Sequence, residues 1–466
     1  MSGNLRFVER SDDGHIRRFQ YRKSAEKRHT SSYVDERLPI PNTHLQVKEL
    51  LSKVFLPSGY PNSVSPDYLR YQIFNALQAF CSSLAGLLSS RALLEGFGVG
   101  NPDASATHAL LLTVLQDFFG RITTICAAYA LGPSLGAEAK TFRFLADVAN
   151  DAAIVLDTLS PLLLSRLKFP GTRVLALCLS GSLRAMCGIC AGGSKAALAI
   201  HFSTPVSGSG DIGDLNAKDS SKETVLALFG MLAGSLIVPY LTSSRETYFV
   251  LFTLVGLHLL LNYLGVRGVV LRTLNKQRLS IAWNYFCDQL HAPSPAQVSY
   301  RERVLSWKFN ALGDEGVTCS IGSSLASILS EDASVPSSLL RSMQHEAYVL
   351  WFDPVCLAPA QAAFRPDVPR SMIHMHICLR EGYSSADVVK SWVHATEVER
   401  MISMDRRLSL SALVLDAHQK VNEHWSSFME EMAEKGWETR ETTLMIGMPR
   451  AVIDQLEVEE EDRKRR

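Results

Sequence analysis

The chain has 466 residues, with 47 Lys and Arg against 47 Asp and Glu, so no overall charge favours nucleic acid or an acidic partner. Its mean hydropathy of +0.06 is too low for a protein that lies wholly in a membrane, and it fits an apolar middle between polar ends. The nine cysteines are scattered, and the pair Cys187 and Cys190 has no second pair nearby. We therefore expect buried thiols and no metal site.

Residues 1–49 are polar, and we expect them to form a mobile N-terminal arm. A basic run lies within this arm, between Arg17 and Arg28. Residues 1–30 lack an apolar core and contain several acidic side chains. The sequence therefore predicts neither a secretory signal nor an organelle transit peptide.

A segment rich in Pro and Gly leads into six predicted helices, at residues 68–94, 106–131, 138–164, 174–200, 224–242 and 247–266. In the first helix, Asn75, Gln78 and Ser82 recur at helical spacing as a small and polar stripe, which favours close helix packing. The last two helices contain no Asp, Glu, Lys or Arg. Each has about 20 residues, which is enough to span a bilayer.

The second helix carries a possible ion pair, because Asp117 and Arg121 are four residues apart and share one helix face. A charged side chain at the centre of a spanning helix costs roughly 2.5–3.5 kcal/mol, and each large apolar residue returns only about 0.3–0.6 kcal/mol. We therefore expect this helix to need a partner surface or a polar cavity in order to insert.

The third helix has a polar face, made by Asp147, Asn150, Asp151 and Asp157. At the helical period these side chains fall within an arc of roughly 120°. Two interpretations are open. The face is either the solvated side of an amphipathic helix or the polar lining of a cavity between helices.

Residues 192–223 read as a polar loop between two strongly apolar segments. Its candidate ligand-binding residues are Lys195, His201, Asn216, Lys218, Asp219 and Glu223, to which we add Asp147, Asn150 and Asp151. We expect Lys218, Asp219 and Glu223 to cap the fifth helix, where the helix dipole favours carboxylates. Polar groups beside apolar helices are costly, so we expect a functional site here. The order Gly-Ser-Lys at 193–195 excludes a phosphate-binding loop.

The placement of Lys and Arg predicts the topology. Residues 95–105 contain neither, whereas the connections at 132–143 and 201–223 and the segment after 266 are basic. By the positive-inside rule, about six spans then put both termini in the cytosol, with the protein in an intracellular membrane.

The chain after residue 290 has the composition of an ordinary folded domain. We expect a Pro-rich hinge at 291–297, a soluble α+β domain at 298–450 and a charged tail at 451–466. Strands are predicted at 348–352, 371–379 and 442–448, with amphipathic helices at 384–402 and 410–436. His374, His376 and Cys378 alternate on one strand, but no further ligand is near in sequence, so a metal site is not favoured.

Long motifs run in order through the chain, and they are FLPSGYPNSVSPDYLRYQIFNALQAFCSSLAGLL (55–88), GRI (120–122), FLADVANDAA (144–153), GGSKAALAIHF (192–202), DLNAKDSSKET (214–224) and NYLGVRGVVLRTLNKQRLS (262–280). Together they resemble the root UV-B sensitive (RUS) family over residues 50–290, and the C-terminal region is more loosely similar. Lys195 stands where many relatives carry Arg, which keeps the charge but loses the planar fork.

The resemblance implies a membrane-associated protein. Plant members are tied to UV-B sensing in roots, seedling development, vitamin B6 homeostasis and auxin transport, and two paralogues act as a complex. No catalytic activity is established for the family. The resemblance therefore implies membrane lipid and a RUS paralogue or a second copy as partners.

The sequence is compatible with two functions. The first is a transporter-like or vitamin B6-related homeostasis protein with a polar intramembrane site for a small polar ligand. The second is a non-catalytic membrane scaffold acting with a paralogue. They differ in whether the polar residues converge on one cavity. We expect no enzyme and no cofactor, because no nucleophile–base pair or nucleotide motif is present. A vitamin B6 role would also allow Lys195 to react with an aldehyde through its amine. That reaction would require Lys195 to lie in a pocket that lowers the pKa of its ammonium group.

Overall fold

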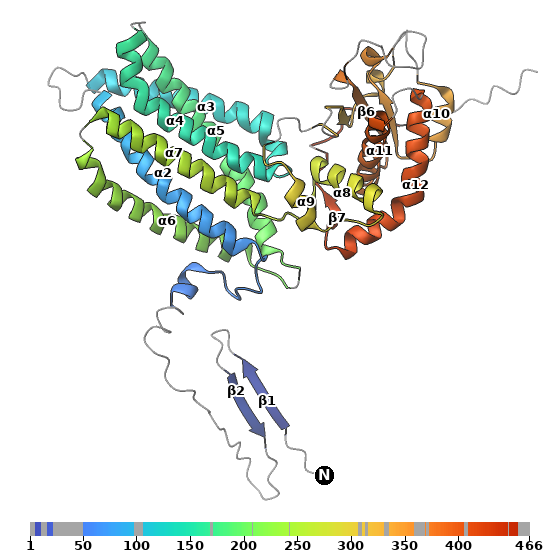
Figure 1. Ribbon diagram of the computed structural model, residues 1–466, viewed down its shortest axis with the longest axis horizontal. Helices are drawn as coiled ribbons and strands as arrows, with labels where there is room; N and C mark the ends of the chain where they lie inside the picture. Colours follow the sequence, from blue (N-terminus) through green and yellow to red (C-terminus); the bar gives the residue numbers. More distant parts are fainter. Residues whose placement is uncertain are drawn as a thin grey trace, which may run out of the picture.

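The protein is described by a computed structural model, which covers residues 5–10, 16–21, 50–96, 106–167, 171–206, 208–241, 243–305, 310–312, 316–329, 335–357, 369, 372–404, 409–445 and 447–454. A long helical bundle adjoins a smaller α+β unit (Figure 1). This confirms the prediction of a mainly helical chain with a small C-terminal region containing strands. In the N-terminal arm, β1 (Leu5–Arg10) pairs antiparallel with β2 (Ile16–Tyr21), a hairpin that the sequence analysis did not predict.

Six long helices form the bundle, and they are α2 (Tyr68–Gly96), α3 (Ala106–Leu131), α4 (Ala139–Leu167), α5 (Thr172–Ser203), α6 (Ile212–Ile237) and α7 (Ser244–Arg267). Successive helices run in opposite directions along the bundle (Figure 1). The short 3₁₀ turns η1 (Gly132–Ser134) and η2 (Val238–Tyr240) lie in two of the connections. A capping box of Ser243 and Glu246 begins α7.

The polar stretch 192–223 is not a loop. Helix α5 continues to Ser203, and α6 begins at Ile212, where the Asp211 carboxylate accepts the N–H groups of Gly213 and Asp214. Lys, Ala and Glu are good helix formers, so a polar composition alone does not end a helix. The expectation that Lys218, Asp219 and Glu223 cap the fifth helix is therefore wrong, because they lie inside α6.

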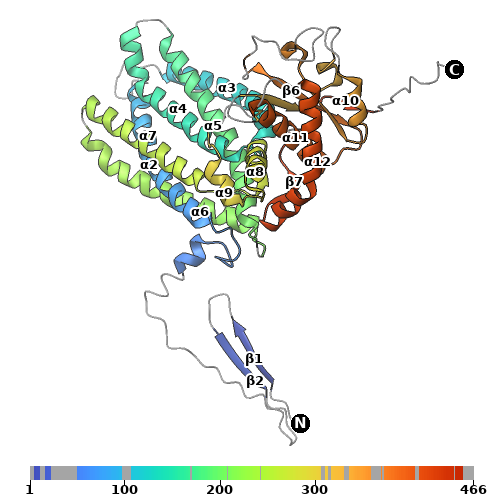
Figure 2. The ribbon, with the colours of Figure 1, turned by 45° about the vertical axis from the view of Figure 1, so that its right-hand side comes forward.

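Helix α4 is the central helix of the bundle. It packs against α2, α5 and α7, whereas α3 lies outside α5 and α6 lies outside α2 (Figures 1 and 2). Its acidic side chains are covered, since Asp147, Asp151 and Asp157 are 8%, 2% and 0% exposed. Of the two interpretations of this helix, the solvated face is wrong.

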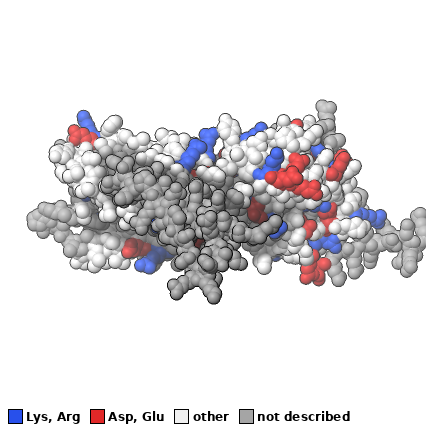
Figure 3. All heavy atoms as spheres, turned by 90° about the horizontal axis from the view of Figure 1, so that it is seen from below, with Lys and Arg blue, Asp and Glu red and all other residues white. Residues whose placement is uncertain are grey.

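Among the described residues, five helical segments are long and apolar enough to cross a membrane, by length and composition. They are Tyr68–Leu94, Leu110–Ser134, Thr172–Ser203, Ile212–Tyr240 and Arg245–Arg267. Helix α4 is not among them, although six spans were predicted. The outer faces of α3 and α6 expose large apolar side chains, including Leu110, Phe118, Leu228 and Leu232. In Figure 3 the charged side chains gather mainly on the C-terminal unit, and most of the visible bundle surface is uncharged.

The C-terminal unit holds the strands β3 (Thr273–Leu274), β4 (Thr318–Ile321), β5 (Tyr348–Phe352), β6 (His374–Arg380), β7 (Glu438–Thr442) and β8 (Val452–Ile453). Its helices are α8 (Lys276–Gln289), α9 (Pro295–Arg301), α10 (Ser337–Ser342), α11 (Ser385–Met404) and α12 (Leu410–Glu434), with 3₁₀ turns η3 (Leu325–Ser327) and η4 (Pro354–Cys356). One sheet has the order β4-β6-β5, with β8 also on β6, and β3 pairs with β7.

The predicted strands at 348–352 and 371–379 and both predicted C-terminal helices are confirmed. The strand predicted at 442–448 is wrong. Strand β7 ends at Thr442, and Gly447 adopts a φ of 76°, which suits a turn rather than a strand.

Helix α8 belongs to the core of the C-terminal unit, although the sequence analysis assigned it to the domain 50–290. Trp283 is fully buried there and donates its Nε1–H to Glu397 Oε2 at 2.9 Å. The Pro-rich segment 291–297 is fastened to the same core, because Trp437 Nε1 donates to the Pro293 carbonyl at 2.8 Å. The hydrophobic core of the α+β unit therefore includes side chains that precede the predicted hinge, from Leu274 of β3 onward.

A buried ionic network joins the bundle to the C-terminal unit. Lys140, at the start of α4, lies 2.6 Å from Glu302, and Arg278 of α8 lies 2.9 Å from the same carboxylate. Burial opposes ionisation, but Arg278 and Lys140 lower the pKa of Glu302. Beside them, Asn275 donates to Glu138 at 3.0 Å. Burial raises the pKa of Glu138 to about 7, although Arg278 opposes the change.

The extent of the C-terminal unit can be tested with two fragments. We expect residues 270–454 to unfold cooperatively and 298–450 to lack a cooperative transition, because the shorter fragment loses Trp283 and all of α8. Removing one buried Trp side chain costs about 3–5 kcal/mol, which is comparable with the whole stability of a small domain. Thermal unfolding is followed by circular dichroism and tryptophan fluorescence. Equal transitions for the two fragments would contradict the assignment of α8.

The junction predicts a pH effect. The folded pKa of Glu138 is above its ordinary value of 4.5, so this group stabilises the fold fully below pH 4.5. That stability is lost as the pH rises through about 7. Glu138→Gln should therefore be more stable than the parent protein at pH 8, by about 2–3 kcal/mol at most, and equally stable near pH 5.

Thermal unfolding of the purified protein at pH 5, 6, 7 and 8, followed by circular dichroism, measures this difference. The exposed Glu434→Gln is the control, and it should leave the pH profile unchanged. A parallel pH profile for Glu138→Gln and the parent protein would show that Glu138 is ionised throughout.

Candidate functional site

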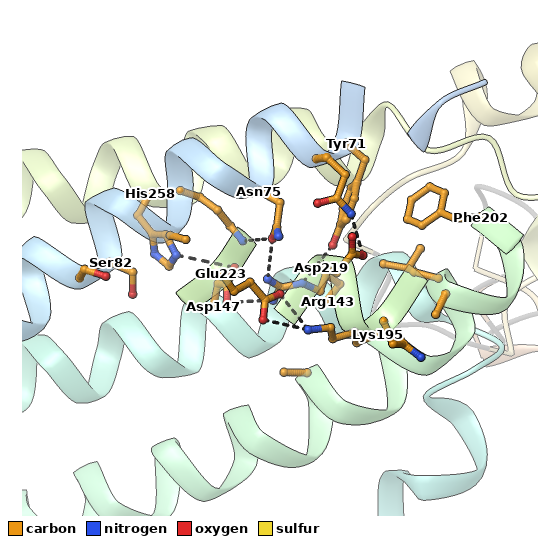
Figure 4. A pocket seen from close by; sticks show the side chains of 18 residues that line it. Tyr71, Asn75, Ser82, Arg143, Asp147, Lys195, Phe202, Asp219, Glu223 and His258 are labelled. Carbon is orange, nitrogen blue, oxygen red and sulfur yellow. Dashed lines mark hydrogen bonds and ion pairs between the residues drawn. The ribbon is translucent and has the colours of Figure 1, made fainter. Parts of the chain in front are cut away.

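A cavity of about 430 Å³ lies inside the bundle, between α2, α4, α5, α6 and α7 (Figure 4). We call it the bundle pocket. Its polar lining residues are Tyr71, Gln72, Asn75, Gln78, Ser82, Ser83, Arg143, Asp147, Lys195, Asn216, Asp219, Glu223 and His258. They come from the first half and the middle of α2, from the first halves of α4 and α6, and from the second halves of α5 and α7. The bundle pocket therefore lies in the half of the bundle nearer the C-terminal unit.

Arg143 and Asp147 form the central ion pair of the pocket. They are one turn apart on α4, and their atoms Nη1 and Oδ1 are 2.9 Å apart. Arg143 also donates to the Tyr71 hydroxyl at 3.3 Å and to Asn75 at 3.4 Å. Asn262 of α7 donates to the second oxygen of Asp147. Side chains from three helices therefore hold this pair in one arrangement.

A histidine bridges two carboxylates behind this pair. His258 Nδ1 lies 2.7 Å from Asp151 Oδ2, and its Nε2 lies 3.7 Å from Asp147 Oδ2. The side chains of His258 and Asp151 are each only 3% exposed. Asp151 is therefore connected to the pocket through His258.

Asp219 of α6 forms a second cluster on the opposite wall. It accepts hydrogen bonds from the Tyr68 hydroxyl and from Gln72, both at 2.8 Å, and Lys222 lies 2.7 Å away. Far from capping a helix, Asp219 fastens α6 to the first turns of α2.

Lys195 and Glu223 form an ion pair across the gap between α5 and α6. The Lys195 ammonium donates to both carboxylate oxygens, at 2.8 and 2.9 Å. Both side chains are a little over 40% exposed, so the pair lies at an open side of the pocket. Helices α5 and α6 make few other contacts, and this pair is a main link between them.

Of the nine candidate ligand-binding residues, Asp147, Lys195, Asn216, Asp219 and Glu223 line the pocket. Asp151 lies one step behind it, as described above. The other three lie outside. Asn150 donates to Ser82 at 3.3 Å, His201 pairs with Asp67 at 3.0 Å, and Lys218 donates to the Lys53 carbonyl at 2.5 Å.

The predicted pair of Asp117 and Arg121 is not formed. Both residues are exposed on α3, and within the described residues no ion pair joins them. An exposed pair of this spacing contributes only about 0.2–0.5 kcal/mol, so the spacing alone does not enforce the contact.

Arg143, Tyr71, Gln72 and His258 were missed by the sequence analysis. The stripe of Asn75, Gln78 and Ser82 on the first helix was recognised, but as a packing feature. His258 and Asn262 are spaced one turn apart in an otherwise apolar helix. That isolated polar pair was the available signal.

The described residues contain no group of three or more His, Cys, Asp or Glu side chains that could hold a metal ion. His374 and His376 are instead bonded to hydroxyls, with Thr318 at 2.7 Å from His374 and Ser323 at 2.9 Å from His376. Cys378 is buried beside them.

These features define a helical-bundle protein with membrane-length outer helices and an internal polar pocket. Residues 41–289 match the family model described as the vitamin B6 photo-protection and homoeostasis domain. Residues 291–450 match the model described as the C-terminal region of root UVB sensitive protein. The chain therefore belongs to the root UVB sensitive (RUS) family.

Three relatives illustrate the similarity. RUS family member 1 of Dictyostelium discoideum is 34% identical over 55% of this chain and 48% of its own length. Protein root UVB sensitive 3 of Arabidopsis thaliana is 34% identical over 54% of this chain and 56% of its own length. The match thus spans about half the length of these two relatives. Protein root UVB sensitive 2, chloroplastic, of Arabidopsis thaliana is 26% identical over 87% of this chain and 85% of its own length. No solved structure matches the chain.

The central ion pair predicts a non-additive mutational effect. Asp147→Asn leaves the buried Arg143 without its counter-charge and should destabilise the bundle by roughly 3–5 kcal/mol. Adding Arg143→Met should recover part of this loss, because both charges are then absent. All six tryptophans lie at or after residue 283, so circular dichroism is the suitable probe of bundle unfolding.

The exposed Asp117→Asn on α3 serves as the control and should be neutral. If the double variant loses as much stability as the two single variants added together, Arg143 and Asp147 do not act as a pair.

Proposed function

We propose that this protein is an integral membrane protein whose bundle pocket binds a small polar solute, in a transporter-like or vitamin B6-related homeostasis role. One observation carries the proposal. Charged side chains from three helices, α4, α5 and α6, and His258 of α7 converge on a single cavity inside a bundle whose outer helices have membrane length. Charged groups within membrane helices are costly and mark solute or ion sites.

Membrane insertion is supported by the distribution of polarity. The outer helices α3 and α6 expose Leu, Phe and Ile side chains, whereas the acidic face of α4 is enclosed. A central polar helix can cross the bilayer when neighbouring helices cover its polar groups. We propose that α4 crosses in this way, as a sixth span within five apolar ones.

An even number of crossings puts both ends of the bundle on one side. The segment before α2 and the C-terminal unit lie at the same end of the bundle (Figure 1). Arg267, Arg272, Lys276 and Arg278 follow α7 at that end, which favours a cytosolic location. We propose an intracellular membrane with both termini in the cytosol.

The polar side chains converge on one cavity, which supports solute binding. A non-catalytic scaffold would instead be expected to have these side chains scattered over its surface. The arrangement does not support a reaction of Lys195 with an aldehyde. Both oxygens of Glu223 hold the Lys195 ammonium, so a free amine is not presented to the pocket. We assign no catalytic role to the pocket.

The family description names vitamin B6, so the B6 vitamers are the solutes to test first. Asn216 lies at the pocket wall and is partly exposed, which leaves room for a bulky side chain. We expect at least one of pyridoxine, pyridoxal and pyridoxamine to raise the unfolding temperature of the parent protein in detergent. The same vitamer should have no effect on Asn216→Trp.

Lys218→Ala is the matched control, because Lys218 is on the same helix and outside the pocket. It should respond to the vitamer as the parent protein does. Absence of any vitamer effect, or an equal effect on Asn216→Trp, would contradict the proposed function. Uptake of the binding vitamer into proteoliposomes then distinguishes transport from storage or sensing.

A further inference from the structure

The charges around the bundle pocket are unequal in number. The carboxylates are Asp147, Asp151, Asp219 and Glu223, and the permanent cations are Arg143, Lys195 and Lys222. His258 is the remaining base, and its charge depends on a proton. The site is balanced only when His258 is protonated.

The imbalance lies in the most enclosed part of the site. Asp219 pairs with Lys222, Glu223 pairs with Lys195, and Asp147 pairs with Arg143. Among the described residues, His258 is the basic side chain paired with Asp151, and Asp151 Oδ1 has no hydrogen-bond partner although the residue is 2% exposed. Asn262 Oδ1 also has no partner within the described part of the chain. A buried carboxylate without a counter-charge is strongly unfavourable, and one extra proton on the pair of Asp151 and His258 would supply that counter-charge.

Every helix packed around this pair contributes polar groups. Tyr71, Asn75, Gln78 and Ser82 of α2 line the same pocket as His258. Asn262 of α7 donates to Asp147, and Asn150 of α4 is the polar neighbour of Asp151. Cys81 of α2 and Cys187 of α5 lie within electrostatic range of the carboxylates. None of these groups carries a positive charge at neutral pH, so Arg143 and the proton on His258 are the cations available to Asp147 and Asp151.

The residue that would hold this proton lies at the bundle pocket. His258 lines the bundle pocket, and its Nε2 points to the Asp147 oxygen that also accepts from Asn262. A solute ammonium that binds at Asp147 adds one positive charge to a neutral site. Loss of the proton from His258 restores neutrality.

We propose that the bundle pocket exchanges one proton, held between His258 and Asp151, for a solute that carries one positive charge. This rests on the proposed function and adds the charge class of the solute. The proton leaves His258 as the solute's ammonium group takes its place beside Asp147, and the number of charges in the pocket stays constant.

The test uses two solutes of nearly equal shape. Pyridoxamine carries an ammonium group where pyridoxine has a hydroxyl. Binding to the full-length protein in detergent is measured between pH 6.0 and 7.5, together with the protons released in weakly buffered solution containing an indicator dye. We expect pyridoxamine to release about one proton per molecule bound and to bind up to about tenfold more tightly per pH unit. Pyridoxine should show neither effect.

His258→Gln and Asp151→Asn should both abolish proton release and flatten the pH dependence, and the second variant covers the case in which the first does not fold. Lys218→Ala is the control, because Lys218 lies outside the pocket and donates to the Lys53 carbonyl. It should release protons as the parent protein does.

The outcomes separate the two proposals. If both vitamers bind equally and no proton is released, the exchange is wrong and the solute pocket stands. If His258→Gln releases as many protons as the parent protein, the proton is held elsewhere and the exchange is wrong. If neither vitamer binds, the proposed function fails and the exchange fails with it.

Discussion

The architecture depends on one constraint, which is that the acidic face of α4 must be covered and neutralised. Asp147, Asp151 and Asp157 are fully or almost fully buried, and each needs a basic partner within the bundle. Arg143 pairs with Asp147 on the same helix, His258 of α7 pairs with Asp151, and Arg184 of α5 pairs with Asp157. These requirements place α5 and α7 against α4, and the bundle pocket is the space that remains beside them.

The end of the bundle that contains the bundle pocket is also bound to the C-terminal unit. Asp67, just before α2, accepts from the backbone N–H of Val270 at 2.7 Å and pairs with His201 at the end of α5. Lys140 at the start of α4 is held by Glu302. The helix ends that shape the pocket are therefore fixed by contacts with the segment that follows α7.

Small residues determine which helices approach closely. A Cβ added at Gly230 or Gly234 of α6 would lie 2.5 or 2.2 Å from side chains of α2, so the glycines allow α6 to lie against α2. Helix α6 has no comparable seam with α5, where Lys195 and Glu223 bridge the gap instead. The pocket is closed firmly on the α2 side and only by an ion pair on the α5 side.

The sequence by itself determined that six long helices lie in the bundle, although not where α6 begins. It likewise determined the two long C-terminal helices and the strands at 348–352 and 371–379, because hydrophobic period and turn residues act locally. It also singled out Asp147, Lys195, Asp219 and Glu223 as unusual polar residues. Only the tertiary structure decided that residues 192–223 are largely helical, that α8 belongs to the C-terminal core and that His258 completes the pocket. The partners involved are far apart in the chain, with 107 positions between His258 and Asp151 and 151 between Tyr68 and Asp219. Such pairings depend on which helix faces meet, and no local pattern encodes that choice.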